Sequence, residues 1–381
     1  MNAKKILKIT AITLASVICL FVMIAGGYVA YVAAQYYRIE DNLKLGVSDG
    51  ATRSAAAGET FTVMTYNLGF GAYSPEYSFF MDTGVMKDGT EVTGKYAKGT
   101  SREDVRKNVD GQLSVAKAAA ADFYFFQEVD ESADRSYKID MKAAAISAFG
   151  GYSAVYAENF HTARLFYPLS DPIGKTNAGL LTLSALKVGS AVRRSFPVTD
   201  NFIDKLFDLD RCFSVHYVPV EHSEAQLVMI NLHMSAYDKG GTVRASQLEM
   251  LNAVLAEEYA KGNFVVAGGD FNHCLIADEF DSDEEALTHF KSEQKVPEWV
   301  KNSVLRSAEL AQAFTLAADA DTATCRAAEM PYTKGVNYTT TVDGFIVSDN
   351  VEVVSVSTVD TEYAYSDHNP VVLEFRLKNE T

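Results

Sequence analysis

The chain contains little cysteine, proline and tryptophan: among its 381 residues are four cysteines, eight prolines and one tryptophan. One cysteine, Cys19, lies in an apolar stretch near the amino terminus, which leaves three scattered along the rest of the chain. An odd, scattered set excludes a disulfide framework, and no two cysteines have the spacing of a zinc site. With 48% hydrophobic residues, the chain can instead build a sizeable core.

Basic charge is also scarce, since 34 Lys and Arg residues stand against 50 Asp and Glu residues, a formal net charge of -16. An acidic surface does not attract nucleic acid or anionic lipid over long range. Charge therefore argues against a polynucleotide substrate, although local cations and a bound metal can override the net field. No basic stripe with interleaved aromatic residues is present, and the pair Arg193-Arg194 is interpreted as solvated.

The longest apolar stretch, residues 9–34, follows a segment of residues 1–8 that contains three lysines. A bilayer-spanning helix requires roughly 20 residues. Lysines before the stretch and few after it predict a cytoplasmic amino end and an extracellular catalytic domain, in a single-pass protein of the cell membrane. The alternative is a signal peptide cleaved near Ala33-Ala34, which would leave a secreted protein. The apolar stretch is long for a signal peptide, so an uncleaved signal anchor is favoured.

Beyond the anchor, residues 35–59 are predicted to be a linker, because Gly, Ser, Ala and Asp are frequent there without apolar periodicity. Residues 60–378 are predicted to form one catalytic domain. Their patterns predict helices over 104–121, 141–149 and 242–259, and strands over 61–66, 123–128, 152–157, 180–188, 211–220, 226–232, 340–347 and 371–377. Residues 73–98 are expected to be a long loop near the site.

The chain is organised around a further predicted strand, 264–267, which the pair Gly268-Gly269 is expected to end. Asp270 and Asn272 follow directly. In an extended segment, residues two apart point the same way. Both side chains are therefore expected to face one point, where they can hold a water molecule and a charged oxygen. Ordinary turn chemistry is the alternative for these residues.

Three other predicted strands also end in a polar residue, at Asn67, Glu128 and His233. A parallel crossover through the first helix would bring Glu128 beside Asn67. A carboxylate that ends a buried aromatic strand is costly unless something binds it, and Mg²⁺ prefers oxygen ligands. An N-cap or a surface ion pair is the alternative for Glu128. His233 can donate a proton or contact a phosphoryl oxygen, although a lone histidine is more often structural.

Near the carboxyl end, Asp343 opens one strand and the pair Asp367-His368 precedes the last. In such a pair the carboxylate can bind a metal while the imidazole faces phosphate. Asp343 can orient that imidazole and stabilise its cationic form. Lys175 and Asn177 can bind phosphate at the mouth of the site, but both are also ordinary loop residues.

Taken in order, these motifs resemble those of the endonuclease/exonuclease/phosphatase superfamily, which includes DNase I, AP endonucleases, inositol polyphosphate 5-phosphatases and Mg²⁺-dependent neutral sphingomyelinases. The resemblance covers about residues 60–378 and implies a four-layer α/β sandwich, in which two mixed β-sheets pack face to face between outer helices. The matching motifs are Thr65-Tyr66-Asn67, Phe126-Gln127-Glu128-Val129, Asn231-Leu232-His233, Gly269-Asp270-Phe271-Asn272, Val342-Asp343-Gly344-Phe345 and Ser366-Asp367-His368-Asn369-Pro370.

The resemblance also implies a cofactor. Glu128 would be the principal ligand of Mg²⁺, for which Mn²⁺ is a substitute, and Asn67 and Asp367 would lie near the metal or the phosphate.

Five further residues would carry the chemistry. Asp270 would activate or position the attacking water, and Asn272 would orient this water or the phosphate. His368, held by Asp343, would stabilise the pentacoordinate transition state, and His233 would contact the phosphate or leaving group. Hydrolysis of a phosphate ester requires an in-line water and stabilisation of the developing oxyanions.

The resulting prediction is a metal-dependent phosphoesterase that acts on a phosphate mono- or diester in a phospholipid, a phosphoinositide or a small phosphorylated molecule. An extracellular nuclease and a non-catalytic surface-binding module are the alternatives. Leu68-Gly69 stands where AP endonucleases usually carry an acid, and His233 where they tend to have tyrosine. The pattern is therefore more similar to DNase I, sphingomyelinases and related phosphatases.

Overall fold

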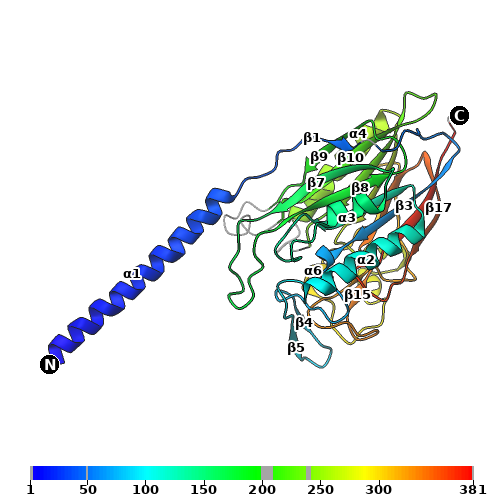
Figure 1. Cartoon of the computed structure of the whole chain (residues 1–381). Coiled ribbons are helices and arrows are strands. Elements are labelled where there is room, and N and C mark those ends of the chain that lie inside the picture. The colour runs from blue at the N-terminus through cyan, green and yellow to red at the C-terminus, as the bar shows by residue number, and fades with distance from the viewer. Residues whose placement is uncertain (1–2, 49, 199–208, 237–241, 380–381) are drawn as a thin grey trace.

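The computed structural model describes residues 3–48, 50–198, 209–236 and 242–379. In these residues, two seven-stranded sheets pack face to face (Figure 1). One, here the β3 sheet, has the order β17 (Val351–Thr358), β18 (Val371–Leu377), β3 (Thr60–Asn67), β6 (Phe123–Asp130), β8 (Asn177–Ser184), β7 (Ser153–His161) and β2 (Val47–Ser48). The other, the β12 sheet, has the order β1 (Leu43–Leu45), β9 (Ser190–Ser195), β10 (Cys212–Pro219), β11 (Gln226–His233), β12 (Phe264–Asp270), β16 (Asp343–Ser348) and β13 (Phe314–Ala317).

Both sheets are mixed, because each contains one parallel pair among antiparallel ones. Along the chain, helix α2 (Arg102–Ala119) connects the parallel strands β3 and β6. Helix α4 (Thr242–Ala260) likewise connects the parallel strands β11 and β12. The helix predicted over 104–121 is thus confirmed with a shift of two residues. Ser101 caps its start by accepting a hydrogen bond from the Asp104 backbone N–H, and Ala120 ends it in a left-handed conformation.

The core has three apolar layers. Side chains of both sheets fill the space between them, and α2 and α3 (Met141–Ala148) cover the outer face of the β3 sheet, while α4 covers that of the β12 sheet. Residues of the central layer include Phe61, Phe125, Met229, Val266 and Phe345. Helices outside two packed sheets make the four-layer α/β sandwich that the resemblance implies.

The predicted linker is partly built into the domain. Strands β1 and β2 lie within residues 35–59 and pair with β9 and β7, so this stretch adds an edge strand to each sheet. The expectation that Arg193 is solvated is wrong, since its side chain is fully buried. Its guanidinium donates hydrogen bonds to the carbonyls of Glu40, Glu158 and Asp210, and therefore ties the linker to the β12 sheet.

Shorter elements surround the edge of the sheets that carries the predicted site. The loop expected over residues 73–98 contains a hairpin of β4 (Thr83–Val85) and β5 (Glu91–Thr93). Segments 277–340 contribute α5 (Asp283–Leu287), α6 (Glu298–Lys301), β14 (Cys325–Arg326) and β15 (Thr339–Thr340). The expected strand 180–188 begins earlier, at Asn177, and ends at Ser184.

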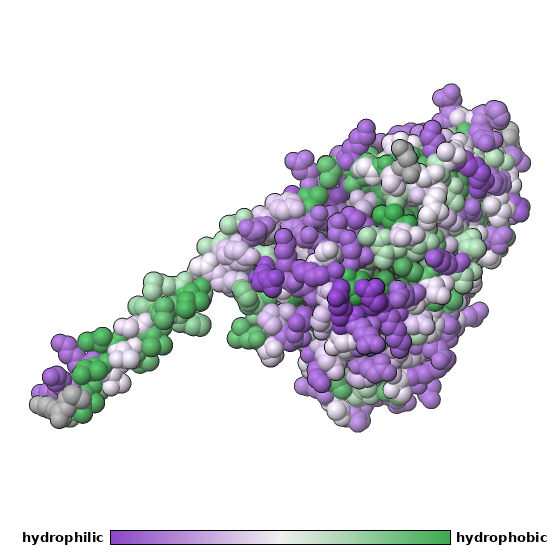
Figure 2. Space-filling model, viewed as in Figure 1, coloured by the Kyte–Doolittle hydropathy of each residue, from purple (hydrophilic) through white to green (hydrophobic). Residues whose placement is uncertain are grey.

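Helix α1 (Ala3–Gln35) extends away from the sheets (Figure 1). In the described parts of the chain it is the one helix long and apolar enough to cross a membrane. Hydrophobic side chains cover most of its visible surface (Figure 2). The helix is therefore a candidate membrane span or signal sequence.

Candidate active site

Strand β12 ends at Asp270, on the edge of the sheets where β3, β11 and β16 also carry polar residues. The register pairs His233 with Asp270 across β11 and β12, and Asp270 with Asp343 across β12 and β16. The strand runs through the glycine pair and does not stop there, contrary to expectation. A Cβ on Gly269 would lie 2.0 Å from the carbonyl oxygen of Leu232, so this glycine permits the close approach of β11.

The carboxylate of Asp270 is buried and fixed by three donors. Its Oδ2 lies 3.0 Å from Asn67 Nδ2 and 3.2 Å from His233 Nε2, and its Oδ1 accepts a hydrogen bond of 2.9 Å from the Asn272 backbone N–H. Burial by itself would raise the pKa of Asp270, but His233, His368 and these hydrogen bonds lower it well below its ordinary value. The group is therefore ionised at neutral pH.

Asn272 reaches Asp270 in a different way from the one expected. The segment is not extended, because Asn272 has a φ of 51°. Its backbone N–H closes a turn onto Asp270, while its side-chain Nδ2 donates to the Met234 carbonyl at 2.9 Å. The turn chemistry given as the alternative is thus present, and it holds Asn272 beside the carboxylate.

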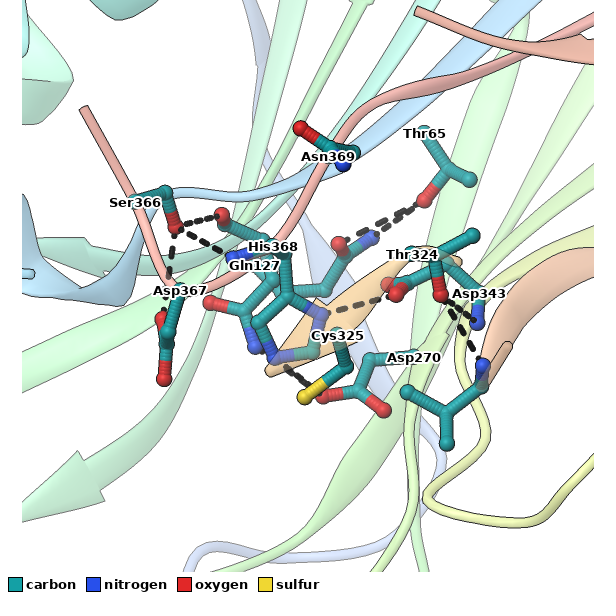
Figure 3. A network of polar contacts seen from close by, with 12 residues as sticks. Thr65, Gln127, Asp270, Thr324, Cys325, Asp343, Ser366, Asp367, His368 and Asn369 are labelled. Atoms are coloured by element: carbon teal, nitrogen blue, oxygen red, sulfur yellow. Dashed lines mark hydrogen bonds and ion pairs between the residues drawn. The ribbon is translucent and has the colours of Figure 1, made fainter. Parts of the chain in front are cut away.

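His368 and Asp343 form a buried pair on the other side of Asp270 (Figure 3). The Nδ1 atom of His368 lies 2.7 Å from Asp343 Oδ2, and its Nε2 lies 3.8 Å from Asp270 Oδ2. Burial favours the neutral ring, but the Asp343 carboxylate raises the pKa of His368 well above its ordinary value. The Thr324 hydroxyl accepts hydrogen bonds from the backbone N–H groups of Val342 and Asp343, which positions the acid.

His233 has the opposite charge state. Burial lowers the pKa of His233, and the nearby Arg211 guanidinium lowers it further, so the ring is neutral at physiological pH. Its Nε2 is directed at Asp270, and its buried Nδ1 has no hydrogen-bond partner among the described residues. Arg211 is itself buried, and within the described ranges its Nε and Nη1 atoms also have no hydrogen-bond partner. An anion at this place would satisfy the guanidinium.

Glu128 lies in a β-bulge. Two residues of β6, Gln127 and Glu128, fall between the pairs Phe126–Leu181 and Val129–Gly179, where β8 has one residue. Glu128 takes a left-handed conformation with a φ of 53°, which is strained for a residue other than glycine. Such bulges re-aim side chains.

The Glu128 carboxylate is partly buried and forms no hydrogen bond or ion pair in the described parts of the chain. Burial raises the pKa of Asp367 to about 6, and the Glu128 charge contributes to this rise against the effect of His368. Two carboxylates that repel each other at one edge are a suitable donor set for a hard divalent cation.

A second group of possible ligand atoms is present in the same site. One atom each from Asp270, Asp343 and His368 lie within 4.8 Å of one another. In this group, however, Asp343 and His368 Nδ1 already bind each other. The oxygen atoms of Glu128 and Asp367 have fewer protein partners, so they fit a Mg²⁺ ion better.

Two predicted residues are less well placed. The Lys175 side chain is exposed and does not line the buried cluster. Its backbone N–H donates a hydrogen bond to Asp134. Asn177 opens β8, and its carbonyl accepts a hydrogen bond from the Glu131 backbone N–H. Both residues lie at the β8 end of the edge, beyond the bulge.

The structure also shows supporting residues to which the sequence analysis assigned no role. Gln127 donates to the Asn231 side chain at 2.8 Å and so links the two sheets directly beneath the site. Cys325 lies beside His368 (Figure 3), and burial raises the pKa of its thiol to about 12. Cysteine 325 has no neighbouring motif, so nothing in the local sequence indicates this position.

Known proteins share this fold. An endonuclease/exonuclease/phosphatase from Beutenbergia cavernae is similar over 84% of this chain and 72% of its own, with 15% identity and a TM-score of 0.53. ANGEL2, a 2',3'-cyclic phosphatase solved with adenosine-2',3'-vanadate, is similar over 88% of this chain and 99% of its own, with 17% identity and a TM-score of 0.51. No curated protein sequence matches the chain.

The two packed sheets with their outer helices are the fold of these two structures. The model of the Endonuclease/Exonuclease/phosphatase family matches residues 64–368, most of the chain. The chain belongs to this family, whose members hydrolyse phosphoester bonds and typically depend on a divalent metal. The resemblance noted in the sequence is thereby confirmed.

Proposed function

We propose that the protein is a Mg²⁺-dependent phosphoesterase that hydrolyses a phosphate mono- or diester by in-line attack of water. The substrate class is a phospholipid, a phosphoinositide or a small phosphorylated molecule. The observation that carries the proposal is the buried Asp270 carboxylate, ionised and fixed by three donors, with the His368–Asp343 pair 3.8 Å away.

Asp270 has the task of positioning the water. A carboxylate whose pKa is lowered is a weak base, so it accepts the proton of the water only as the bond to phosphorus forms. Asn67 and His233 restrict the rotation of this carboxylate and thereby set the direction of attack. Asn272 completes the arrangement through its backbone N–H.

His368 supplies positive charge. As an imidazolium held by Asp343, it offers an Nε2–H donor to the phosphoryl oxygens, whose negative charge grows in the transition state. Glu128 and Asp367, with Asn67 nearby, would hold the Mg²⁺ ion, which Mn²⁺ can replace. When bound, the metal would neutralise charge on the phosphoryl group. Lys175, Asn177 and the buried Arg211 are candidate contacts for other parts of the substrate.

A substrate screen of the purified full-length protein tests the proposal. The substrates are DNA, RNA, sphingomyelin, phosphatidylinositol phosphates and soluble phosphate esters, each with Mg²⁺, with Mn²⁺ and with a chelator. We expect metal-dependent hydrolysis that Asp270→Asn abolishes. Glu298→Gln is the matched control, because this acid is exposed and lies in α6, outside the site.

Hydrolysis that persists in Asp270→Asn, or the absence of hydrolysis on every substrate, would overturn the proposal. Cleavage restricted to DNA or RNA would favour an extracellular nuclease instead.

A further inference from the structure

The loop between β7 and β8 carries an exposed hydrophobic end that the active site does not use. Three side chains, here called the loop tip, are exposed by 50% (Phe166), 65% (Tyr167) and 86% (Leu169). The ring of Tyr167 lies 5.5 Å from that of Phe80, next to the exposed Met81. Large apolar side chains that gather on a surface mark interaction sites.

The same loop packs against the domain end of α1. The ring of Phe166 lies 5.7 Å from that of Tyr28, whose hydroxyl accepts a hydrogen bond of 3.2 Å from the Phe166 backbone N–H. Val32 forms an apolar cluster with Ala163 and Leu165. Phe166 of the loop tip is therefore held beside Tyr28 of the helix.

The level of Tyr28 lies near the end of a membrane span that begins at Ile9. Residues 9–28 are 20 residues, and 20 helical residues at about 1.5 Å each cover the roughly 30 Å of a hydrocarbon core. Tyr28 and Tyr31 follow at this end, and Tyr36 and Tyr37 lie just beyond it. Tyrosines are enriched at the boundary between the bilayer and water. A bilayer that holds α1 would thus have its outer boundary at the loop tip.

Charge around the loop tip does not oppose contact with lipid. The chain has a net charge of -16, but the charged residues of 162–175 are Arg164, Lys175 and Asp171, and Arg164 pairs with Asp134 at 3.1 Å. Asp171 is itself paired with Lys98 at 2.5 Å. The acidic excess that would repel anionic lipid is therefore absent from this loop.

We propose that Phe166, Tyr167 and Leu169 insert into the outer interface of the bilayer that holds α1, as a second membrane contact. The proposal rests on the predicted signal anchor, with the catalytic domain on the extracellular side. Two contacts fix the orientation of the domain where one flexible anchor cannot. Asn177 follows the loop directly, so the β8 end of the site faces the lipid headgroups and receives substrates presented at the membrane surface.

Fluorescence of the full-length protein in lipid vesicles tests this insertion. Trp299 is the only native tryptophan and provides a constant background in all variants. Leu169→Trp reports on the loop tip, and Phe21→Trp, in the middle of α1, reports on the anchor. Val354→Trp is the control, because it is exposed on β17, at the end of the domain away from α1 (Figure 1).

We expect brominated acyl chains to quench Leu169→Trp and Phe21→Trp but not Val354→Trp, with a blue shift of the Leu169→Trp emission. If Leu169→Trp remains as bright as Val354→Trp while Phe21→Trp is quenched, the insertion is refuted. If Phe21→Trp is also bright, the anchor and the insertion both fail. Tyr167→Trp replaces Leu169→Trp if that variant does not fold. The readout requires no hydrolysis, so it is independent of the catalytic proposal.

Discussion

Removal of the negative charge of Asp343 should weaken catalysis more at high pH than at low pH. In the wild type the contact of 2.7 Å keeps His368 protonated above its ordinary pKa of about 6.5. In Asp343→Asn that pKa should fall back toward about 6.5, so about 3% of molecules would carry the imidazolium at about pH 8. Because less of His368 is protonated in the variant, kcat/KM should fall about 30-fold at about pH 8 but less than about 2-fold at about pH 6.

The assay is kcat/KM for the best substrate of the screen, measured for wild type and variant between about pH 6 and pH 8. The ratio of the two removes pH effects that both proteins share. His368→Ala should lose roughly 10²-fold or more, the effect of one charge-stabilising donor. Because the two residues act as a unit, the double variant should lose much less than the product of the single losses. A ratio that does not change with pH, or fully multiplicative losses, would refute the role of the pair.

Three further predictions follow from the anchor, the metal ligands and the linker. Intact protein should fractionate with membranes and keep its amino terminus, and a mature form that starts near Gln35 would show a cleaved signal peptide instead. Glu128→Gln should fold normally but require more Mg²⁺ and turn over more slowly; an unchanged Mg²⁺ titration would contradict its role as a ligand. Arg193→Met should lower the free energy of unfolding by about 3 kcal/mol, because it leaves three carbonyls without their donor, and an unchanged thermal midpoint would argue against this.

Much of the architecture can be predicted from the sequence. Strands rich in β-branched and aromatic residues, separated by helices of apolar periodicity, are evident locally, and both parallel crossovers follow from their order. Of the polar residues that end those strands, His233 lies beside Asp270 because β11 and β12 are parallel neighbours, and Asn67 reaches Asp270 from the facing sheet. Their roles in catalysis remain predictions.

Tertiary structure alone decided how other residues contribute. Local sequence does not indicate that a bulge directs the Glu128 side chain. The bulge arises because β8, some 50 residues away, has one residue opposite two of β6. Nor does it indicate that Arg193 is buried, since Glu40 and Asp210 come to it from distant parts of the chain.

The sequence by itself determined the order of the elements, the apolar helix and the residue types at the strand ends, because these depend on periodicity along a single segment. Only the tertiary structure decided that residues 43–48 complete both sheets and that the loop tip lies beside Tyr28. Such contacts depend on which segment covers a given surface, and periodicity within one segment carries no information about its neighbours in space.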